Sequence, residues 1–260
     1  MTFLGLAAGP AWCAESTARS LVAQSIANYE NDWKAVLDYT YIERDVAKES
    51  SEKVELYQVT VVDGTPYNRL IARDGHPLDT EESRRQAEKY QKVLDARDKE
   101  TPEQRARRIR KYDNERAFLK EIPDAFDMKM LGDETVDGRP NCVIQLTPKE
   151  GYVPDSKYAR IFPSIEGKLW IDQHDMRWTK AVAQVIDTIS FGWILARIGP
   201  GAHITMTQEK VGEHWFPKKI EVEGMARILL VKNRTIDDTI WYENYKRLNR
   251  SPAATDARNR

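Results

Sequence analysis

The stretch Glu166–Asp172, with the sequence Glu-Gly-Lys-Leu-Trp-Ile-Asp, decides the fold class of this 260-residue chain. A glycine turn leads into a short run with a large aromatic and two aliphatic residues, which is typical of a β-strand. Further runs of this kind follow as far as Tyr245, and no interval is long enough for a crossover helix. Strands joined by short turns pair antiparallel. This part of the chain is therefore predicted to be an antiparallel meander with one buried face.

The same pattern occurs upstream. Polarity alternates over Trp33–Lys48, and two further runs, Val54–Val62 and Tyr67–Ala72, each end at an Asp-Gly pair, a strong hairpin signal. A third Asp-Gly pair separates runs that begin at Phe126 and Cys142. The other predicted strands are Lys168–Gln173, Thr179–Ile189, Ala202–Gly212, Trp215–Met225 and Ile228–Tyr245, the last as one bent strand or two. A sheet of roughly ten strands must curl or close.

The N-terminal region carries two signals. Residues 3–14 are apolar and small, too short to span a bilayer, and they resemble the end of a secretory signal whose mature chain begins near Glu15. We therefore expect residues 1–14 to be a signal-peptide remnant and Cys142 to be left without a disulfide partner. The stretch Ser16–Asn31 has apolar residues at helical spacing, which predicts a helix with one apolar face that needs a surface to lie on.

Residues 79–120 are rich in Arg, Lys and Glu and predict a charged helical insertion within a single domain at 15–248. Asp79 with Glu82, and Thr101 followed by Pro102, are typical helix starts. The basic excess of the insertion suits either an anionic partner or an ordinary solvated helix face with paired charges. Residues 249–260 are predicted to form a disordered tail.

No pattern of catalytic or metal-binding residues accompanies these elements. The net charge is −1, which argues against nucleic acid as a partner. The four histidines, His76, His174, His203 and His214, lack metal-ligand spacing, and the chain has no nucleophile elbow, phosphate loop or dinucleotide fingerprint. We therefore expect no enzyme activity, no metal and no cofactor. A glycosidase-like carboxylate pair stays open, because such pairs meet in space and not in sequence.

Several short motifs together resemble one group of exported bacterial proteins. The motifs are Asp63-Gly64, Arg69–Leu78, Gly138-Arg139-Pro140, Leu146-Thr147-Pro148, Gly167–Asp172 and Ile189–Gly192. In this combination the chain resembles the outer-membrane lipoprotein-sorting superfamily (LolA-like and LolB-like proteins). The resemblance implies an α+β fold: a strongly curved antiparallel half-barrel whose concave face is covered by helices and binds acyl chains. The charged insertion departs from the compact carriers of that superfamily.

Candidate ligand-binding residues follow from the alternation of side chains and from one apolar connection. Inward positions are predicted for Leu37, Tyr39, Leu56, Met128, Ile144, Leu169, Ile171 and Val185. A flap that covers the apolar face and contacts an acyl chain is predicted at Phe191, Trp193, Ile194 and Leu195; the alternative is a static plug of the core.

We accordingly expect a monomeric periplasmic binding protein that holds acyl chains of a lipid or lipoprotein, as a carrier or sensor in envelope biogenesis. Its expected partners are those acyl chains and envelope lipoprotein-transport proteins. Two alternatives stay open at this point: a non-catalytic envelope scaffold or regulator with the same fold and a self-filled core, and a hydrolase.

Overall fold

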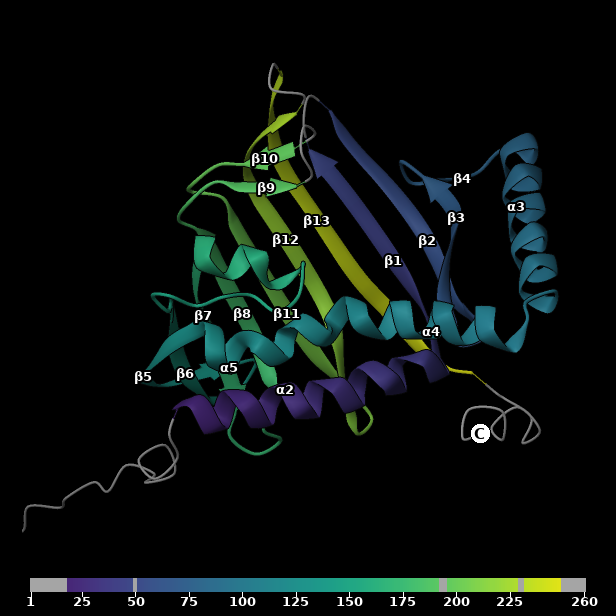
Figure 1. The fold of residues 1–260 in the computed structure, drawn as a ribbon. Coiled ribbons are helices and arrows are strands. Elements are labelled where there is room, and N and C mark those ends of the chain that lie inside the picture. Colours follow the sequence, from purple (N-terminus) through teal and green to yellow (C-terminus); the bar gives the residue numbers. More distant parts are fainter. Residues whose placement is uncertain (1–17, 49–50, 192–195, 229–231, 249–260) are drawn as a thin grey trace, which may run out of the picture.

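Thirteen strands form one antiparallel sheet in the computed structural model, which describes residues 18–48, 51–191, 196–228 and 232–248 (Figure 1). The strands are β1 Tyr39–Lys48, β2 Glu52–Val62, β3 Thr65–Arg73, β4 His76–Pro77, β5 Phe126–Val136, β6 Arg139–Pro148, β7 Ile165–Asp172, β8 Trp178–Val185, β9 Ile189–Phe191, β10 Ala196–Ile198, β11 His203–Val211, β12 His214–Ile228 and β13 Lys232–Arg247. Their order across the sheet is β4-β3-β2-β1-β13-β12-β11-β8-β7-β6-β5, and β9 and β10 branch off beside β12.

The sheet is curved and its helices cover one face, so the predicted open half-barrel with helices on its concave face is confirmed (Figure 1). Neighbouring strands are mostly consecutive in the chain, as expected of a meander. The exceptions are β1 beside β13, β8 beside β11 and β10 beside β12. The pairing of β1 with β13 joins the two ends of the domain and places the N-terminal and C-terminal strands at the middle of the sheet.

The three Asp-Gly pairs make tight hairpin turns. Both residues of each pair have positive φ: 46° and 87° at residues 63–64, 49° and 78° at 74–75, and 48° and 78° at 137–138. Two successive positive φ values define the type I′ turn, whose twist matches that of antiparallel strands and which Asp-Gly adopts readily. These turns set the registers of β2 with β3, β3 with β4 and β5 with β6.

The helices are α2 Ala18–Ala35, α3 Thr80–Asp98, α4 Pro102–Ala117 and the short α5 Ile122–Ala125, with 3-10 turns η1 Val36–Asp38, η2 Phe118–Glu121 and η3 Ala159–Ser164. The prediction of a strand from residue 33 was wrong, because Trp33 and Ala35 lie in α2 and Leu37 lies in η1. Tyr29 and Trp33 continue the apolar stripe of the helix at a spacing of four, and this helical period overrides the local alternation.

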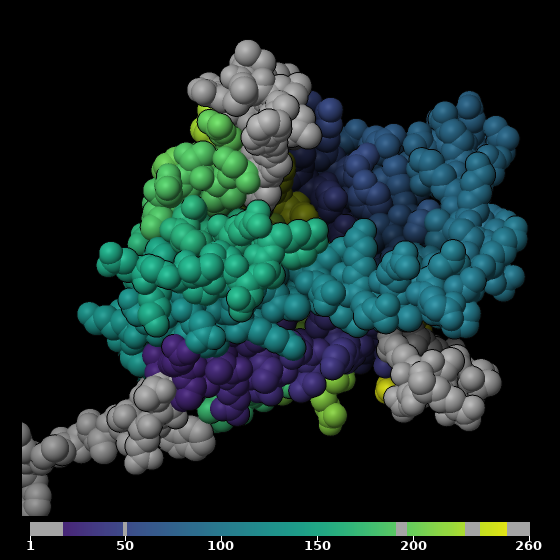
Figure 2. All heavy atoms as spheres, in the orientation of Figure 1, coloured from purple at the N-terminus to yellow at the C-terminus, as the bar shows by residue number. Residues whose placement is uncertain are grey.

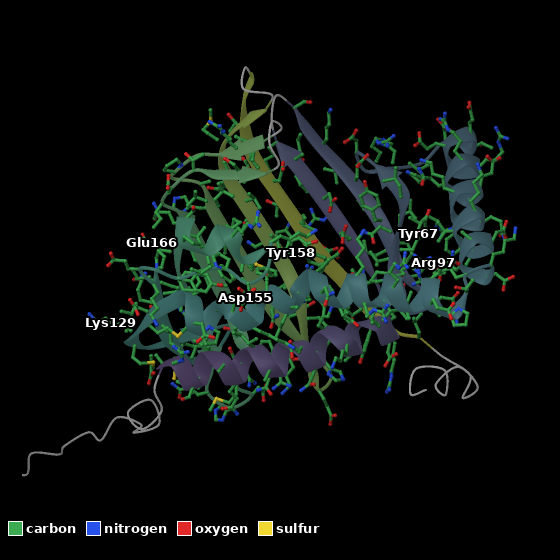
Figure 3. The ribbon with its side chains drawn as sticks, in the orientation of Figure 1. Tyr67, Arg97, Lys129, Asp155, Tyr158 and Glu166 are labelled. Atoms are coloured by element: carbon green, nitrogen blue, oxygen red, sulfur yellow. The ribbon has the colours of Figure 1, made fainter. Side chains whose placement is uncertain are left out.

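The charged insertion forms two helices with the predicted starts. The Asp79 side chain accepts a hydrogen bond from the Glu82 N–H at 2.7 Å, and Thr101 and Gln104 form a reciprocal capping box. The first helix, α3, lies beside the sheet edge at β3, where Tyr67 and Arg97 are placed between the two (Figure 3). The second, α4, crosses the concave face alongside α2 (Figure 1).

The largest buried cluster joins α2 to β6, β7 and β8. Leu21, Val22 and Ile26 of α2 pack with Ile144 and Ile171 of the sheet. This confirms that the N-terminal helix lies on the concave face, as its single apolar stripe predicted.

Cys142 belongs to the same cluster and is disulfide-bonded. The expectation that it has no disulfide partner was therefore wrong. The predicted signal remnant at 1–14 and the predicted tail at 249–260 lie outside the described residues.

Candidate ligand cavity

An apolar cavity of about 380 Å³ lies between α2, the C-terminal end of α4 with η2, and the concave face of the sheet. Its walls include three residues from α2 (Ile26, Tyr29 and Trp33), one from α4 (Arg116) and two from η2 (Phe118 and Leu119). The remaining lining residues are Val36, Tyr41, Glu43, Ile122, Leu169, Trp178, Ala181, Met206, Pro217, Ile220, Tyr242 and Tyr245. Most of these side chains are aromatic or aliphatic, which is the composition expected of a site for an apolar ligand.

Beyond α4 the same face is hollowed, and β1 and β2 lie at the bottom of the recess (Figure 2). A second pocket, of about 640 Å³, occurs on these strands and β13. Asp45, Glu55 and Asp238 are among its lining residues, so it is polar where the cavity under α4 is apolar. The concave face therefore divides into an apolar part covered by helices and a polar part left open.

Two ionisable side chains line the apolar cavity. Burial, together with the nearby Asp45, raises the pKa of Glu43 to about 7, although a hydrogen bond from Asn68 at 2.8 Å acts in the opposite direction. Arg116 places its guanidinium 4.4 Å from the centre of the Trp33 ring, a cation–π contact. Among the described residues, neither side chain forms an ion pair.

Different interactions hold the two helices that cover the cavity. In α2 seven residues are buried, and the carboxylate of Asp32 accepts a hydrogen bond from Arg177 Nε at 2.6 Å and contacts His214 Nδ1 at 3.1 Å. In α4 no residue is buried. The first half of α4 is tied to the β2–β3 hairpin through Arg108, which bonds Glu100 at 2.7 and 2.5 Å and Thr65 at 2.9 Å. Its second half contacts Trp33 of α2 through Tyr112 and Arg116. Thus α2 is part of the core, whereas α4 is held by contacts of partly buried side chains.

The aspartates at the β7–β8 turn form a structural ion-pair network. Asp172 is fully buried and accepts two hydrogen bonds from Arg139, at 2.6 and 2.9 Å, and backbone hydrogen bonds from His174 and Asp175. Burial alone would raise the pKa of Asp172, but these bonds hold it below its usual value. Asp175 in turn pairs with Arg139 and Lys210. With all these partners, the two carboxylates stabilise the turn.

The structure brings one of the predicted inward residues, Leu169, to the cavity wall. Met128, Ile144 and Ile171 belong to or pack against the cluster under α2, but they do not line the cavity. Val185 packs in a separate cluster with Ile189 and Ala202.

The other predicted residues lie elsewhere. Leu37 and Tyr39 pack around Phe216. Leu56 pairs directly with Arg44 across β1 and β2, so it shares the face of Arg44 and not that of Glu43. The alternation was therefore assigned to the wrong face in β2. Phe191 ends β9, and the rest of the predicted flap, Trp193, Ile194 and Leu195, lies outside the described residues.

Sequence reasoning missed most of the cavity wall. Tyr41 and Glu43 follow Tyr39 at alternate positions of β1, and this spacing was an available signal. Tyr242 and Tyr245 were hidden because they are three positions apart, an odd spacing that normally places side chains on opposite faces of a strand. A bulge at Asn244, with φ 59°, brings both to the same side. Arg116 was treated as part of a charged helix face.

Two further findings concern the described parts of the chain. Among these residues, no group of three or more His, Cys, Asp or Glu side chains is arranged to hold a metal ion. No described helix has the length and hydropathy needed to cross a membrane.

Comparison with protein-family models gives no match, and neither does comparison with curated proteins. Solved structures do match. A LolA superfamily protein from Nitrosomonas europaea is 12% identical with a TM-score of 0.35, the match covering 92% of this chain and 96% of that one. A putative outer-membrane lipoprotein-sorting domain from Vibrio parahaemolyticus is 11% identical with a TM-score of 0.38, covering 90% and 96%. A DUF1329 family protein from Desulfovibrio piger is 10% identical with a TM-score of 0.33, covering 91% and 97%.

The matched structures thus include proteins of the superfamily that the sequence motifs resemble.

Proposed function

We propose that this protein is a non-catalytic periplasmic binding protein that holds acyl chains of a lipid or lipoprotein in the cavity beneath α4, as a carrier or sensor. The observation that carries the proposal is the combination of an apolar cavity of about 380 Å³ with a cover, α4, that has no buried residue. Cavities of roughly 300–1,000 Å³ with apolar walls are typical of small-molecule sites.

Binding of this kind needs no catalyst. Each methylene moved from water into the cavity contributes about 0.8 kcal/mol. Several methylenes together can therefore compete with a cover that buries no side chain fully. Such competition would allow α4 to open for a chain and to close over it, which is the behaviour required of a carrier or a sensor.

One feature of the sequence supports export to the periplasm. The apolar, small-residue stretch at 3–14 has the composition of the end of a secretory signal. In the periplasm, acyl chains and the envelope proteins that transport lipoproteins are the natural partners of the proposed site.

Displacement of the neutral fluorescent probe N-phenyl-1-naphthylamine by methyl dodecanoate tests the proposal. Ala181 lines the cavity, whereas its neighbour Val182 pairs with Lys168 and Thr205 and points to the other face. We expect the wild type to bind both compounds, Ala181→Phe to bind them about tenfold more weakly because the ring fills the cavity, and the matched control Val182→Phe to bind as the wild type does.

The melting temperature of each variant shows that it is folded. A wild-type protein that binds neither compound would contradict the proposal and favour the scaffold with a self-filled core. Equal binding by folded Ala181→Phe would place the apolar site elsewhere in the molecule.

A further inference from the structure

A narrow groove of about 250 Å³ runs between α2 and α4 on the outside of the cavity. Three residues line both the groove and the cavity: Tyr29 and Trp33 from α2, and Arg116 from α4. These three side chains are therefore the partition between the interior and the surface. A ligand that enters between the two helices must pass them.

The side chains at this partition carry unused hydrogen-bonding groups. Trp33 stacks on Tyr112 of α4 with ring centres 5.0 Å apart. The Arg116 guanidinium also lies over the Trp33 ring, 4.4 Å from its centre. Trp33 Nε1 and the Tyr112 hydroxyl are buried without a hydrogen-bond partner. Indole Nε1 only donates and a tyrosine hydroxyl can donate, so an oxygen atom of a ligand could accept hydrogen bonds from these two groups.

Charge also favours an anion at the partition. Three cationic side chains line the groove: Lys34, Arg116 and Lys120. The groove has two carboxylates, Glu30 and Asp113, and Glu30 is paired with Lys120 at 2.8 Å. Inside the cavity the charges are separated: Arg116 is its one lining cation and Glu43 its one lining carboxyl among the described residues. An anionic group is thus attracted to the groove and repelled from the sheet wall.

We propose that the groove between α2 and α4 is the headgroup site for a single-chain amphiphile with an anionic head, carboxylate or phosphate. The oxygens of the head accept hydrogen bonds from Arg116 and Trp33 Nε1, and the tail extends into the cavity. The cavity volume, near the lower end of small-molecule sites, suits one chain better than the several chains of a lipoprotein anchor. This inference rests on the proposed acyl-binding function and adds the chemistry of the ligand's polar end.

The test compares three ligands of equal chain length, dodecanoate, dodecyl phosphate and methyl dodecanoate, by displacement of N-phenyl-1-naphthylamine at pH 8. Because a hydrogen bond to a charged group is lost in the ester, we expect at least one anion to bind the wild type about tenfold more tightly than the ester. The anion that binds more tightly identifies the headgroup as a carboxylate or a phosphate.

Arg116→Met should bind anion and ester equally. Arg110→Met, on an exposed position of the same helix, should keep the wild-type preference.

Trp33→Phe is a second variant, which keeps the aromatic ring and removes the Nε1 donor. We expect it to reduce the ratio of anion affinity to ester affinity relative to the wild type. Equal affinities of the wild type for all three ligands would overturn the headgroup site and leave the acyl-binding function intact. Failure of every ligand to displace the probe would overturn both. An anion preference that persists in Arg116→Met and in Trp33→Phe would overturn the assignment to these residues.

Discussion

The two long helices on the concave face, α2 and α4, cover neighbouring parts of the same sheet in different ways. Seven residues of α2 are buried, among them Leu21 and Val22. The carboxylate of Asp32 is also buried, in an ion pair with Arg177 and in contact with His214 Nδ1. In α4 no residue is buried, and three of its six cationic residues, Arg107, Arg110 and Lys111, are exposed. The comparison teaches that position over a sheet does not make a helix part of the core, because the width of its apolar stripe decides this.

The largest expected effect is on the core helix. Leu21→Ala removes a side chain that is 5% exposed and should lower the free energy of unfolding by about 2–5 kcal/mol. The matched change in α4, Ile109→Ala, should cost less than about 1 kcal/mol because Ile109 is only half-buried. Urea unfolding of both variants measures the two costs. Similar losses would show that α4 is as much a part of the core as α2.

A smaller effect is expected from the ion pairs that fix the end of α2. Asp32→Asn keeps the shape of the side chain but leaves Arg177 without its carboxylate. We expect a loss of about 2–3 kcal/mol, below the ~3–5 kcal/mol of a fully buried pair, because Arg177 and His214 are partly exposed. The exposed pair of Lys218 with Asp137 provides the control. Asp137→Asn should change the unfolding free energy by less than about 0.5 kcal/mol, and an equal effect of both changes would refute this role of Asp32.

The smallest effect concerns the sheet wall of the cavity. Because burial raises the pKa of Glu43 to about 7, the folded protein keeps a proton that the unfolded chain releases near pH 4.5. Stability should therefore fall as pH rises from about 4.5 to about 7. Glu43→Gln carries no charge, so its melting temperature relative to wild type should increase by several degrees between pH 5 and pH 8.

Glu150→Gln, at an exposed position, is the control for this pH dependence and should show no such change. A constant difference between Glu43→Gln and wild type from pH 5 to pH 8 would mean that Glu43 is well solvated and that the cavity under α4 is not closed to water.

The sequence predicted those parts of the fold that depend on local chemistry. The Asp-Gly pairs determine their own turns, and the stripe that includes Leu21 and Ile26 identifies α2 and its buried face. The pairing of β1 with β13 joins residues almost two hundred positions apart, and no local pattern encodes it. The cavity depends on this pairing, since Glu43 and Tyr242 lie directly opposite each other on these two strands. Only Leu169 of the predicted inward residues therefore reached the cavity wall.

Hydrogen exchange followed peptide by peptide tests the central claim that α4 is an opening cover over an acyl site and α2 is a fixed part of the core. Without ligand, the amides of Pro102–Ala117 should exchange much faster than those of Ala18–Ala35, because few buried contacts oppose local opening of α4. With saturating dodecanoate, exchange in α4 should slow markedly, while α2 remains slow throughout. Equal protection of the two helices without ligand, or an unchanged α4 when dodecanoate is bound, would contradict the account.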